Sequence, residues 1–464
     1  MASAGIVYID ANDNIVKGSI SATATAVPGI GNLASDKILT LTGDLSSGNY
    51  YGGFGNGAVN SYQLILDNAN ISMGYAIGGY STATNNAENN VVKIKNSNVA
   101  WVLGGMSDGN AKKNTVELIN STAVKVTGGT GNGGYATDNS VYMTDSKVTE
   151  TVQGGDSGNA VIDKVSGNTL YLAGANTIGG DVSNFEKIYI TEAKFGTPAL
   201  ILNGSIQNNP TIDTRGITFT GVDALNAGQK TILIQNNMTN YPAEKILSGK
   251  YKVGSTLEGL GTASISDDDL IYTIDKGTKM EAQEQTHNTV MGATASMAAL
   301  SAGNDFVGAA TEGLSMAGNT GTDGMATYAN MGGGSMNVET GSHVKTHTWN
   351  AILALGHKNE KKLSTTEYGA FFEYGTGNYS TFNGDERGDG STRYTGGGIL
   401  GKWQKNNGFY VEGSLRAGSI HDDATNVLRD VNGNPYSYDT DATYWGAHIG
   451  VGREIKLNKT DILD

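Results

Sequence analysis

Few residues of this chain are arranged for catalysis. Gly155-Asp156-Ser157-Gly158 has the form of a serine-protease nucleophile motif, in which a histidine would have to activate the serine. All six histidines lie beyond residue 280, whereas the chymotrypsin-like order places the histidine before the serine. The first glycine of the string also belongs to a repeated glycine pair, so the repeat already accounts for it. We therefore predict no catalytic residue and a protein that is not an enzyme.

Metal and cofactor sites are not expected either. The chain has no cysteine, which excludes thiolate ligands and disulfides. Asp67, Asp108 and Asp145 stand singly in their repeats, and residues 267–269 form an acidic run that fits a solvated turn. Residues 128–138 resemble a calcium-binding glycine- and aspartate-rich repeat only in part and lack its spacing. We predict neither a metal nor a cofactor.

Composition indicates an all-β, surface-exposed protein. Among 464 residues there are 67 glycines and 5 prolines, with asparagine clusters between short alternating segments, as in folds with many turns. The formal net charge of −14 argues against binding to nucleic acid. The first residues lack the basic and apolar regions of a signal peptide, and no run of about 18 apolar residues occurs.

The N-terminal half is a repeat array. Its glycine pairs recur with a period near 25 residues, and each unit also carries an apolar–x–apolar triplet whose flanking residues can point inward. Asn68, Asn96, Asn120 and Asp145 follow four of the triplets, and such residues tolerate left-handed backbone at a turn. We predict a right-handed parallel β-helix, regular over about residues 50–181 and irregular, with a cap, over residues 182–275. The pairs are Gly52-Gly53, Gly78-Gly79, Gly104-Gly105, Gly128-Gly129, Gly154-Gly155 and Gly179-Gly180.

Residues 281–306 hold the one long helical pattern. Val290, Ala293, Met297 and Leu300 recur at steps of three and four and predict one face of a helix. Its many polar residues exclude a lipid-facing transmembrane helix. Its small residues make the helix slim enough to fit inside a narrow polar pore. The alternative is a solvated helix that connects two β domains.

Residues 321–464 alternate with a period of two over strands of about ten residues. One face is aromatic and aliphatic, and the other carries glycines together with Glu367, Glu373, Glu412, Arg416 and His448. This pattern is typical of an outer-membrane β-barrel whose polar face lines the pore. A soluble antiparallel sandwich with the apolar face in its core shows the same alternation. Polar residues 383–390 and 421–438 are expected to form long loops.

The succession of solenoid, slim polar helix and alternating strands resembles the classical autotransporters of type V secretion. The segments that carry the resemblance are the glycine-pair coils, residues 283–303, and the strands within residues 347–358, 366–379 and 408–418. The resemblance implies a passenger over residues 1–275, a linker helix in the barrel pore over residues 276–320, and the N-terminal part of a barrel over residues 321–464. Outer-membrane lipid and the barrel-assembly machinery are the implied partners.

Two departures from the family pattern bear on these expectations. Family barrels have about twelve strands, whereas five or six are recognisable here, so we expect a fragment with an incomplete transmembrane barrel. Some members cleave themselves at an Asn-Asn pair in the helix, where this chain has His287-Asn288, so we do not expect this self-cleavage, and the passenger either stays attached at the cell surface or is released.

The expected function is export of the passenger to the cell surface, where it serves as an adhesin or interaction surface. Its ligand would be an unidentified host or bacterial surface molecule, and Tyr75, Tyr80, Trp101 and Tyr135 are candidate exposed aromatics. One alternative is a surface enzyme whose catalytic domain lies upstream. The other is a secreted soluble solenoid joined to a β-sandwich.

Overall fold

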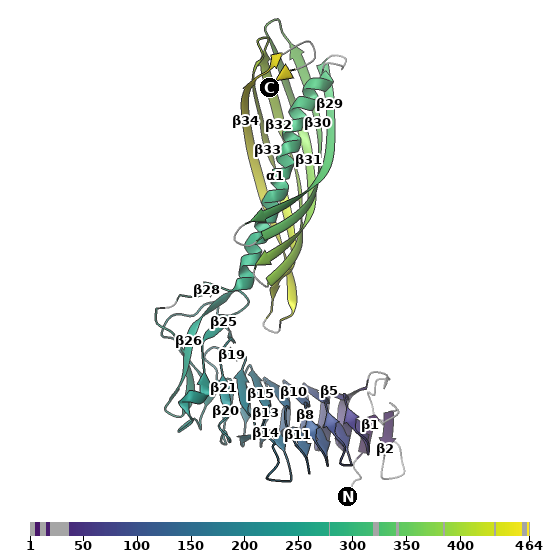
Figure 1. Cartoon of the computed structure of the whole chain (residues 1–464), viewed down its shortest axis with the longest axis vertical. Coiled ribbons are helices and arrows are strands. Elements are labelled where there is room, and N and C mark those ends of the chain that lie inside the picture. Colours follow the sequence, from purple (N-terminus) through teal and green to yellow (C-terminus); the bar gives the residue numbers. More distant parts are fainter. Residues whose placement is uncertain are drawn as a thin grey trace. The chain divides into compact units, whose positions relative to one another are not determined.

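The computed structural model describes residues 5–9, 15–18, 37–277, 279–318, 324–339, 343–383, 386–430, 433–456 and 462–463. The chain divides into two compact units, Met1–Glu281 and Ala282–Asp464 (Figure 1). The first is a β-solenoid and the second combines one long helix with an antiparallel sheet. The predicted fold class is confirmed.

The predicted apolar triplets form a parallel, in-register ladder through the solenoid. Val92 of one coil pairs with Val116 of the next, and Val116 pairs with Val141. All three side chains are fully buried, because the flanking residues of each triplet point inward while the middle residue points out. The strands up to the last regular coil are β1 (Gly5–Ile9), β2 (Ile15–Gly18), β3 (Ile38–Gly55), β4 (Val59–Asn60), β5 (Gln63–Ser81), β6 (Ala87–Glu88), β7 (Val91–Lys95), β8 (Asn98–Ser107), β9 (Ala111–Lys112), β10 (Thr115–Ile119), β11 (Thr122–Gly131), β12 (Ser140–Thr144), β13 (Lys147–Val148), β14 (Val152–Asp156), β15 (Thr169–Ala173), β16 (Asn176–Ile178), β17 (Val182–Ser183) and β18 (Lys187–Ile190).

The turns after the triplets have the predicted left-handed conformation. Asn68, Asn96, Asn120 and Asp145 have φ angles of 52°, 49°, 47° and 48°. Asparagine and aspartate adopt this region more readily than other residues with a Cβ. The turn chemistry therefore repeats with the coil.

A buried asparagine ladder explains the second glycine of three pairs, Gly79, Gly105 and Gly129. Asn90, Asn114 and Asn139 each donate a side-chain hydrogen bond to the next asparagine along the axis, at 3.1, 3.2 and 3.2 Å. A Cβ on Gly105 would lie 2.6 Å from the side chain of Asn114, so only glycine leaves room for the ladder. In these coils the second glycine is thus required by the asparagine side chains stacked inside the solenoid.

Parallel stacking continues into the irregular coils and ends against antiparallel strands. β27 pairs antiparallel with β23, and β26 pairs antiparallel with both β25 and β27. These strands cover ladder edges that would otherwise template aggregation. The elements of this region are β19 (Glu192–Lys194), β20 (Leu200–Leu202), β21 (Thr211–Asp213), β22 (Ile217–Thr220), β23 (Lys230–Gln235), the 3-10 helix η1 (Ala243–Lys245), β24 (Ile246–Leu247), β25 (Lys250–Val253), β26 (Leu257–Ser266), β27 (Asp269–Ile274) and β28 (Glu281–Ala282).

The described residues of the second unit form one helix, a six-stranded meander and a short strand pair. The meander strands have 15 to 21 residues each, and neighbouring strands pair antiparallel in chain order. The prediction of long loops at residues 383–390 and 421–438 is wrong, because strands occupy most of both segments. The elements are α1 (Glu284–Gly318), β29 (Met325–Glu339), β30 (His343–Glu360), β31 (Ser364–Asn383), β32 (Glu386–Lys405), β33 (Phe409–Arg429), β34 (Pro435–Arg453), β35 (Ile455–Lys456) and β36 (Ile462–Leu463).

The sheet face turned away from α1 carries a band of exposed apolar side chains. Trp445, Ile449 and Val451 of β34 are 85%, 79% and 70% exposed. Apolar surface of this extent marks a protein or membrane contact. The same band includes Trp349, Leu353, Leu355, Tyr368, Phe372, Ile399, Trp403 and Leu415 of β30 to β33. Among the described residues, no helix is long and apolar enough to cross a bilayer.

Candidate functional site

A stripe of small residues on α1 packs against the polar face of the sheet. Gly292, Ala295, Ala299 and Gly303 lie on this side of the helix, and all four are buried. Toward the C-terminal end of the helix the contact becomes apolar, in a cluster of Val307, Ala310, Leu314, Ala326, Ile352, Ala354, Phe371 and Leu400. The helix is therefore held along its length by one side.

Tyrosines of the sheet decide which side of the helix fits. A Cβ added to Gly303 would lie 2.2 Å from the hydroxyl of Tyr394, and one added to Gly292 would lie 3.0 Å from the hydroxyl of Tyr379. The first distance is far below any real Cβ contact. Helix and sheet are thus matched in shape, because glycine occurs where a tyrosine hydroxyl reaches the helix.

Arg416 of β33 is the centre of a buried polar network. Its guanidinium donates to the carboxylate of Glu373 at 2.9 Å and to the backbone carbonyl oxygen of Leu300 in α1 at 3.2 Å. The hydroxyl of Tyr444 donates to the other oxygen of Glu373 at 2.8 Å. Both charged side chains are buried, with 9% and 2% exposure, so they depend on each other for compensation. One cation therefore links the sheet to the helix backbone.

Further hydrogen bonds join α1 to the sheet on the N-terminal and C-terminal sides of this network. The hydroxyl of Ser296 lies 3.2 Å from Thr392 Oγ1 and 3.4 Å from Asp422 Oδ1. Near the end of the helix, Ser315 donates to Glu367 at 2.8 Å. Small hydroxyl side chains thus reach the sheet without widening the helix.

The residues of this sheet match one protein family. Residues 327–462 match the family model described as the autotransporter beta-domain. The chain is an autotransporter. No curated protein and no solved structure matches the chain.

In this autotransporter the apolar band faces the lipid of the bacterial outer membrane, and the solenoid is the passenger at the cell surface. This setting overturns the alternative of a secreted soluble solenoid with a β-sandwich.

All five predicted pore-lining residues belong to the sheet face that receives α1. Glu367 and Glu373 are buried there, the first bonded to Ser315 and the second to Arg416, whose side chain is 9% exposed. Glu412 is half-buried and His448 is exposed, and both line a cleft of about 400 Å³ beside Thr311 of the helix. Which groups meet the translocating chain stays a prediction.

The apolar face predicted for the helix differs from the face that packs against the sheet, and its place in the pore stays a prediction. Val290, Ala293 and Met297 are exposed on the side away from the sheet, and Leu300 is half-buried. Apolar periodicity selected these residues, whereas the sheet's tyrosines admit only the small ones. Tyr379, Tyr394 and Asp422 were not singled out from the sequence, although extending the strand alternation to these positions would have indicated an inward side chain.

Asn288 is a further buried polar group of the helix. It is 1% exposed, and neither amide atom has a hydrogen-bond partner among the described residues. The expectation that the helix does not cleave itself here stays a prediction.

The passenger carries a second candidate site, which we call the aromatic groove. It has a volume of about 480 Å³ and is formed by outward-facing side chains of β3, β5, β8, β11 and β14. These side chains stand in three rows along the solenoid axis, because the strands pair in register. The first wall is Asn49, Tyr75, Trp101 and Lys125; the floor is Tyr51, Ile77, Leu103 and Thr127; the second wall is Tyr80, Met106, Thr130 and Asp156.

The groove changes character along its length. Apart from Asn49, aromatic and aliphatic side chains line its first three coils, whereas Lys125, Thr127, Thr130 and Asp156 line the last ones. Burial, with a smaller contribution from Tyr80, raises the pKa of Tyr51 to about 12, so its hydroxyl keeps its proton at neutral pH. Of the four predicted exposed aromatics, Tyr75 (40% exposed), Tyr80 and Trp101 line this groove, and Tyr135 (50% exposed) lies outside it.

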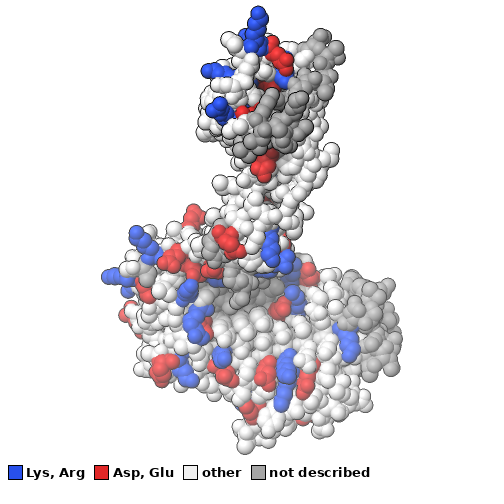
Figure 2. Space-filling model, turned by 45° about the horizontal axis from the view of Figure 1, so that its top comes forward, with Lys and Arg blue, Asp and Glu red and all other residues white. Residues whose placement is uncertain are grey.

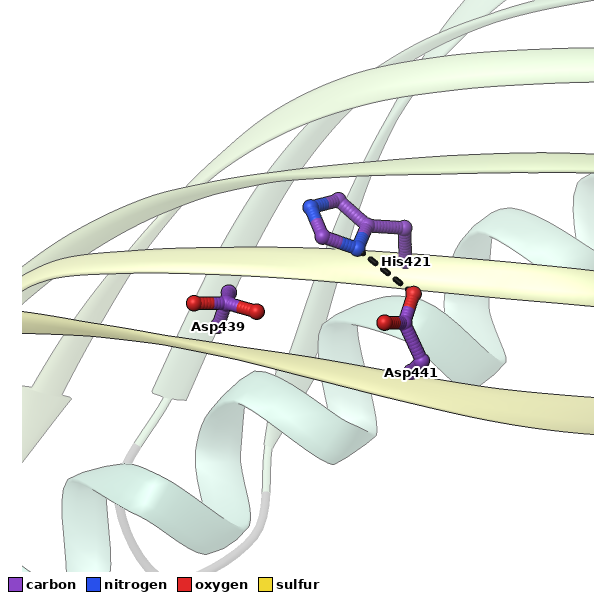
Figure 3. A group of neighbouring side chains, drawn as sticks. All are labelled: His421, Asp439 and Asp441. Atoms are coloured by element: carbon purple, nitrogen blue, oxygen red, sulfur yellow. Dashed lines mark hydrogen bonds and ion pairs between the residues drawn. The ribbon is translucent and has the colours of Figure 1, made fainter.

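One cluster of the β-domain has the residue types of a metal site. His421 of β33 and Asp439 and Asp441 of β34 place possible ligand atoms within 4.8 Å of one another (Figure 3). The imidazole is already engaged, with Nδ1 2.7 Å from Asp441 and Nε2 3.1 Å from Asp423. The absence of a metal stays a prediction.

Proposed function

We propose that the exported solenoid of this autotransporter acts as an adhesin, a rigid rod whose lateral face binds other molecules. The observation that carries the proposal is the aromatic groove, because an open concave surface with exposed aromatic side chains is a common form of binding site. Figure 2 shows Lys, Arg, Asp and Glu interspersed over the visible face of the solenoid, which favours specific contacts over attraction by charge of one sign.

We propose further that the passenger is not an enzyme. Ser157 accepts a hydrogen bond from the backbone of Asn159 at 3.2 Å, a local turn contact. The solenoid contains no histidine, since all six histidines lie beyond residue 280. Ser157 therefore lacks, within the solenoid, the imidazole that usually activates such a nucleophile.

Export itself is the function of the family, and the solenoid suggests how it is driven. Each coil that folds outside the cell buries apolar side chains such as Val116 and Leu118, at about 1.5–3 kcal/mol per fully buried side chain. This gain opposes back-sliding through the pore and requires no nucleotide at the cell surface. We expect the barrel-assembly machinery to insert the β-domain, as the family resemblance implies.

The test is adhesion by cells of a non-adherent diderm host that display the whole protein. Display is first verified by protease accessibility of the solenoid on intact cells. Displaying cells are expected to attach to epithelial monolayers or to one another more than cells carrying the vector. Equal attachment at verified display would refute the adhesin proposal, and Ser157-dependent turnover of a fluorogenic ester or casein would refute the non-enzymatic one.

A further inference from the structure

We propose that the aromatic groove of the passenger binds a neutral hexose oligosaccharide laid along the solenoid axis. The inference rests on the proposed adhesin function and names the chemical class of its ligand. Successive coils are separated by about 4.8 Å, close to the length of one pyranose ring, so the groove accommodates about three or four rings, one per rung.

The aromatic half of the groove offers stacking surfaces for sugar rings. Tyr75 and Trp101 stand on successive rungs of the first wall, with ring centroids 5.1 Å apart and planes tilted by 30°. Tyr75 is 40% exposed, so part of its ring is open to a ligand. The negative face of an aromatic ring attracts the positively polarised C–H face of a pyranose. Stacking at one or two subsites follows from this geometry.

The polar half supplies hydrogen-bonding groups of both kinds. The ammonium of Lys125 can only donate, the carboxylate of Asp156 can only accept, and Thr127 and Thr130 can do either. Among the described residues, neither the ammonium of Lys125 nor the carboxylate of Asp156 hydrogen-bonds to another side chain. Sugar hydroxyls also donate and accept. Because the two formal charges cancel, the groove matches a neutral ligand.

Other classes of ligand fit the groove less well. An extended peptide that joins a sheet needs an unpaired strand edge. The groove instead lies on a sheet face whose strands β5, β8 and β11 are paired on both sides. An amphipathic helix needs an apolar groove throughout, whereas half of this one is polar. A net charge of −14 disfavours nucleic acid.

The first experiment applies displaying cells to a glycan array. The array carries neutral gluco-, galacto- and manno-oligosaccharides of one to six residues, sialylated and uronic-acid glycans, and spots of fibronectin and collagen. We expect binding to neutral oligosaccharides, strongest at about three or four residues. Tyr75→Ala and Asp156→Asn should each weaken it by about tenfold or more, the loss of one stacking or hydrogen-bonding contact. Tyr142→Ala, at a tyrosine of similar exposure (38%) outside the groove, should leave it unchanged.

The second experiment measures binding at the groove directly. Trp101 is the single tryptophan of residues 1–281, and Trp349, Trp403 and Trp445 belong to the β-domain. The whole protein labelled with 5-fluorotryptophan and purified in detergent should give one fluorine signal per tryptophan, and Trp101→Phe identifies the one in the groove. Maltotetraose, cellotetraose and mannotetraose are titrated. At least one should shift the Trp101 signal and leave the other three in place.

The possible outcomes separate this inference from the adhesin proposal. Adhesion to monolayers without Tyr75-dependent binding to any neutral glycan would overturn the oligosaccharide assignment and leave the adhesin proposal standing. Tyr75-dependent binding to the protein spots or only to acidic glycans would also overturn it. Absence of all adhesion would remove both proposals. Tyr75→Phe, which keeps the ring, should retain binding and shows that a loss in Tyr75→Ala is not due to misfolding.

Discussion

The fit between Gly303 of α1 and Tyr394 of β32 can be tested by adding a single methyl group. In Gly303→Ala the new Cβ would lie 2.2 Å from the tyrosine hydroxyl, so the two must separate by about 1 Å to reach ordinary contact. Tyr394 cannot move freely, because its hydroxyl donates to the buried Asn350 at 2.8 Å. Overpacking costs about 1–3 kcal/mol, and a lost hydrogen bond to a buried acceptor costs about as much again.

The helix itself gains about 1 kcal/mol when glycine becomes alanine. The net effect of Gly303→Ala should therefore be to destabilise the folded β-domain by roughly 1–5 kcal/mol. Gly308→Ala is the matched control, because a Cβ there meets nothing within 4 Å. That variant should be neutral or stabilised by up to about 1 kcal/mol.

The assay is thermal unfolding of the whole protein in detergent, followed by heat-modifiable gel mobility and circular dichroism. A double-mutant cycle with Tyr394→Phe isolates the contact, because removing the hydroxyl leaves the ring carbon as the nearest atom, at 3.1 Å. The double variant should be more stable than the two single changes predict, by about 1 kcal/mol or more. Equal melting of Gly303→Ala and Gly308→Ala, or strict additivity in the cycle, would show that the helix does not pack against this tyrosine.

Three further predictions concern the interior of each unit. Asn114→Ala should lower the urea midpoint of the passenger, because it leaves buried hydrogen-bond partners unpaired at a cost of about 1–3 kcal/mol. Asn132→Ala removes only an exposed side-chain hydrogen bond and should leave the midpoint unchanged. Equal midpoints of the two variants would contradict a stabilising ladder. Burial, together with a nearby aspartate, raises the pKa of Glu192, so the folded state binds its proton more tightly and loses stability as pH rises through that pKa. Glu192→Gln should therefore raise the urea midpoint at pH 7 and leave it unchanged at about pH 3.5, and a gain of the same size at both pH values would refute this. Arg416→Met leaves the buried Glu373 without its counter-ion, which destabilises the β-domain by about 3–5 kcal/mol and should reduce passenger display on intact cells. Combining Arg416→Met with Glu373→Gln should recover part of the display. Unchanged display in the single variant would refute the role of the pair.

The solenoid could be predicted from its sequence because each coil repeats the same local constraints. The triplet around Glu117 alternates apolar and polar residues, and the left-handed turn at Asn120 follows from that residue's own chemistry. The asparagine ladder was less accessible. Asn114 faces inward only because Gly105, nine residues earlier, leaves space for it, and that pairing depends on the width of the coil.

The β-domain could be predicted in kind but not in detail. Strand alternation correctly placed Glu373 and Arg416 on the inward face, because a period of two can be recognised from neighbouring residues in the sequence alone. The helix face was missed because it depends on Tyr379 and Tyr394, which lie many residues away and reach the helix only in the folded sheet. The strand ends around Asn383 were interpreted as loops, because a strand that is polar on its outward face has no apolar alternation to show.

The helix–sheet contact and the solenoid interior differ in chemistry, and the difference suits the two steps of export, movement of the chain and retention of its folded part. The contact between α1 and the sheet includes hydrogen bonds, such as that from Arg416 to the carbonyl of Leu300, and on the proposed export route such groups can bind water while the chain moves. The interior of the solenoid is lined by residues such as Val116 and Leu118, which are fully buried and lose their stabilisation when a coil opens. On the proposed export route, polar contacts therefore permit sliding where the chain has to move, and apolar stacking prevents return where it has already folded. The close approach of Gly303 to Tyr394 favours the register seen in the structure, because shifting the helix by one residue would bring the side chain of Ala302 or Asn304 against the tyrosine.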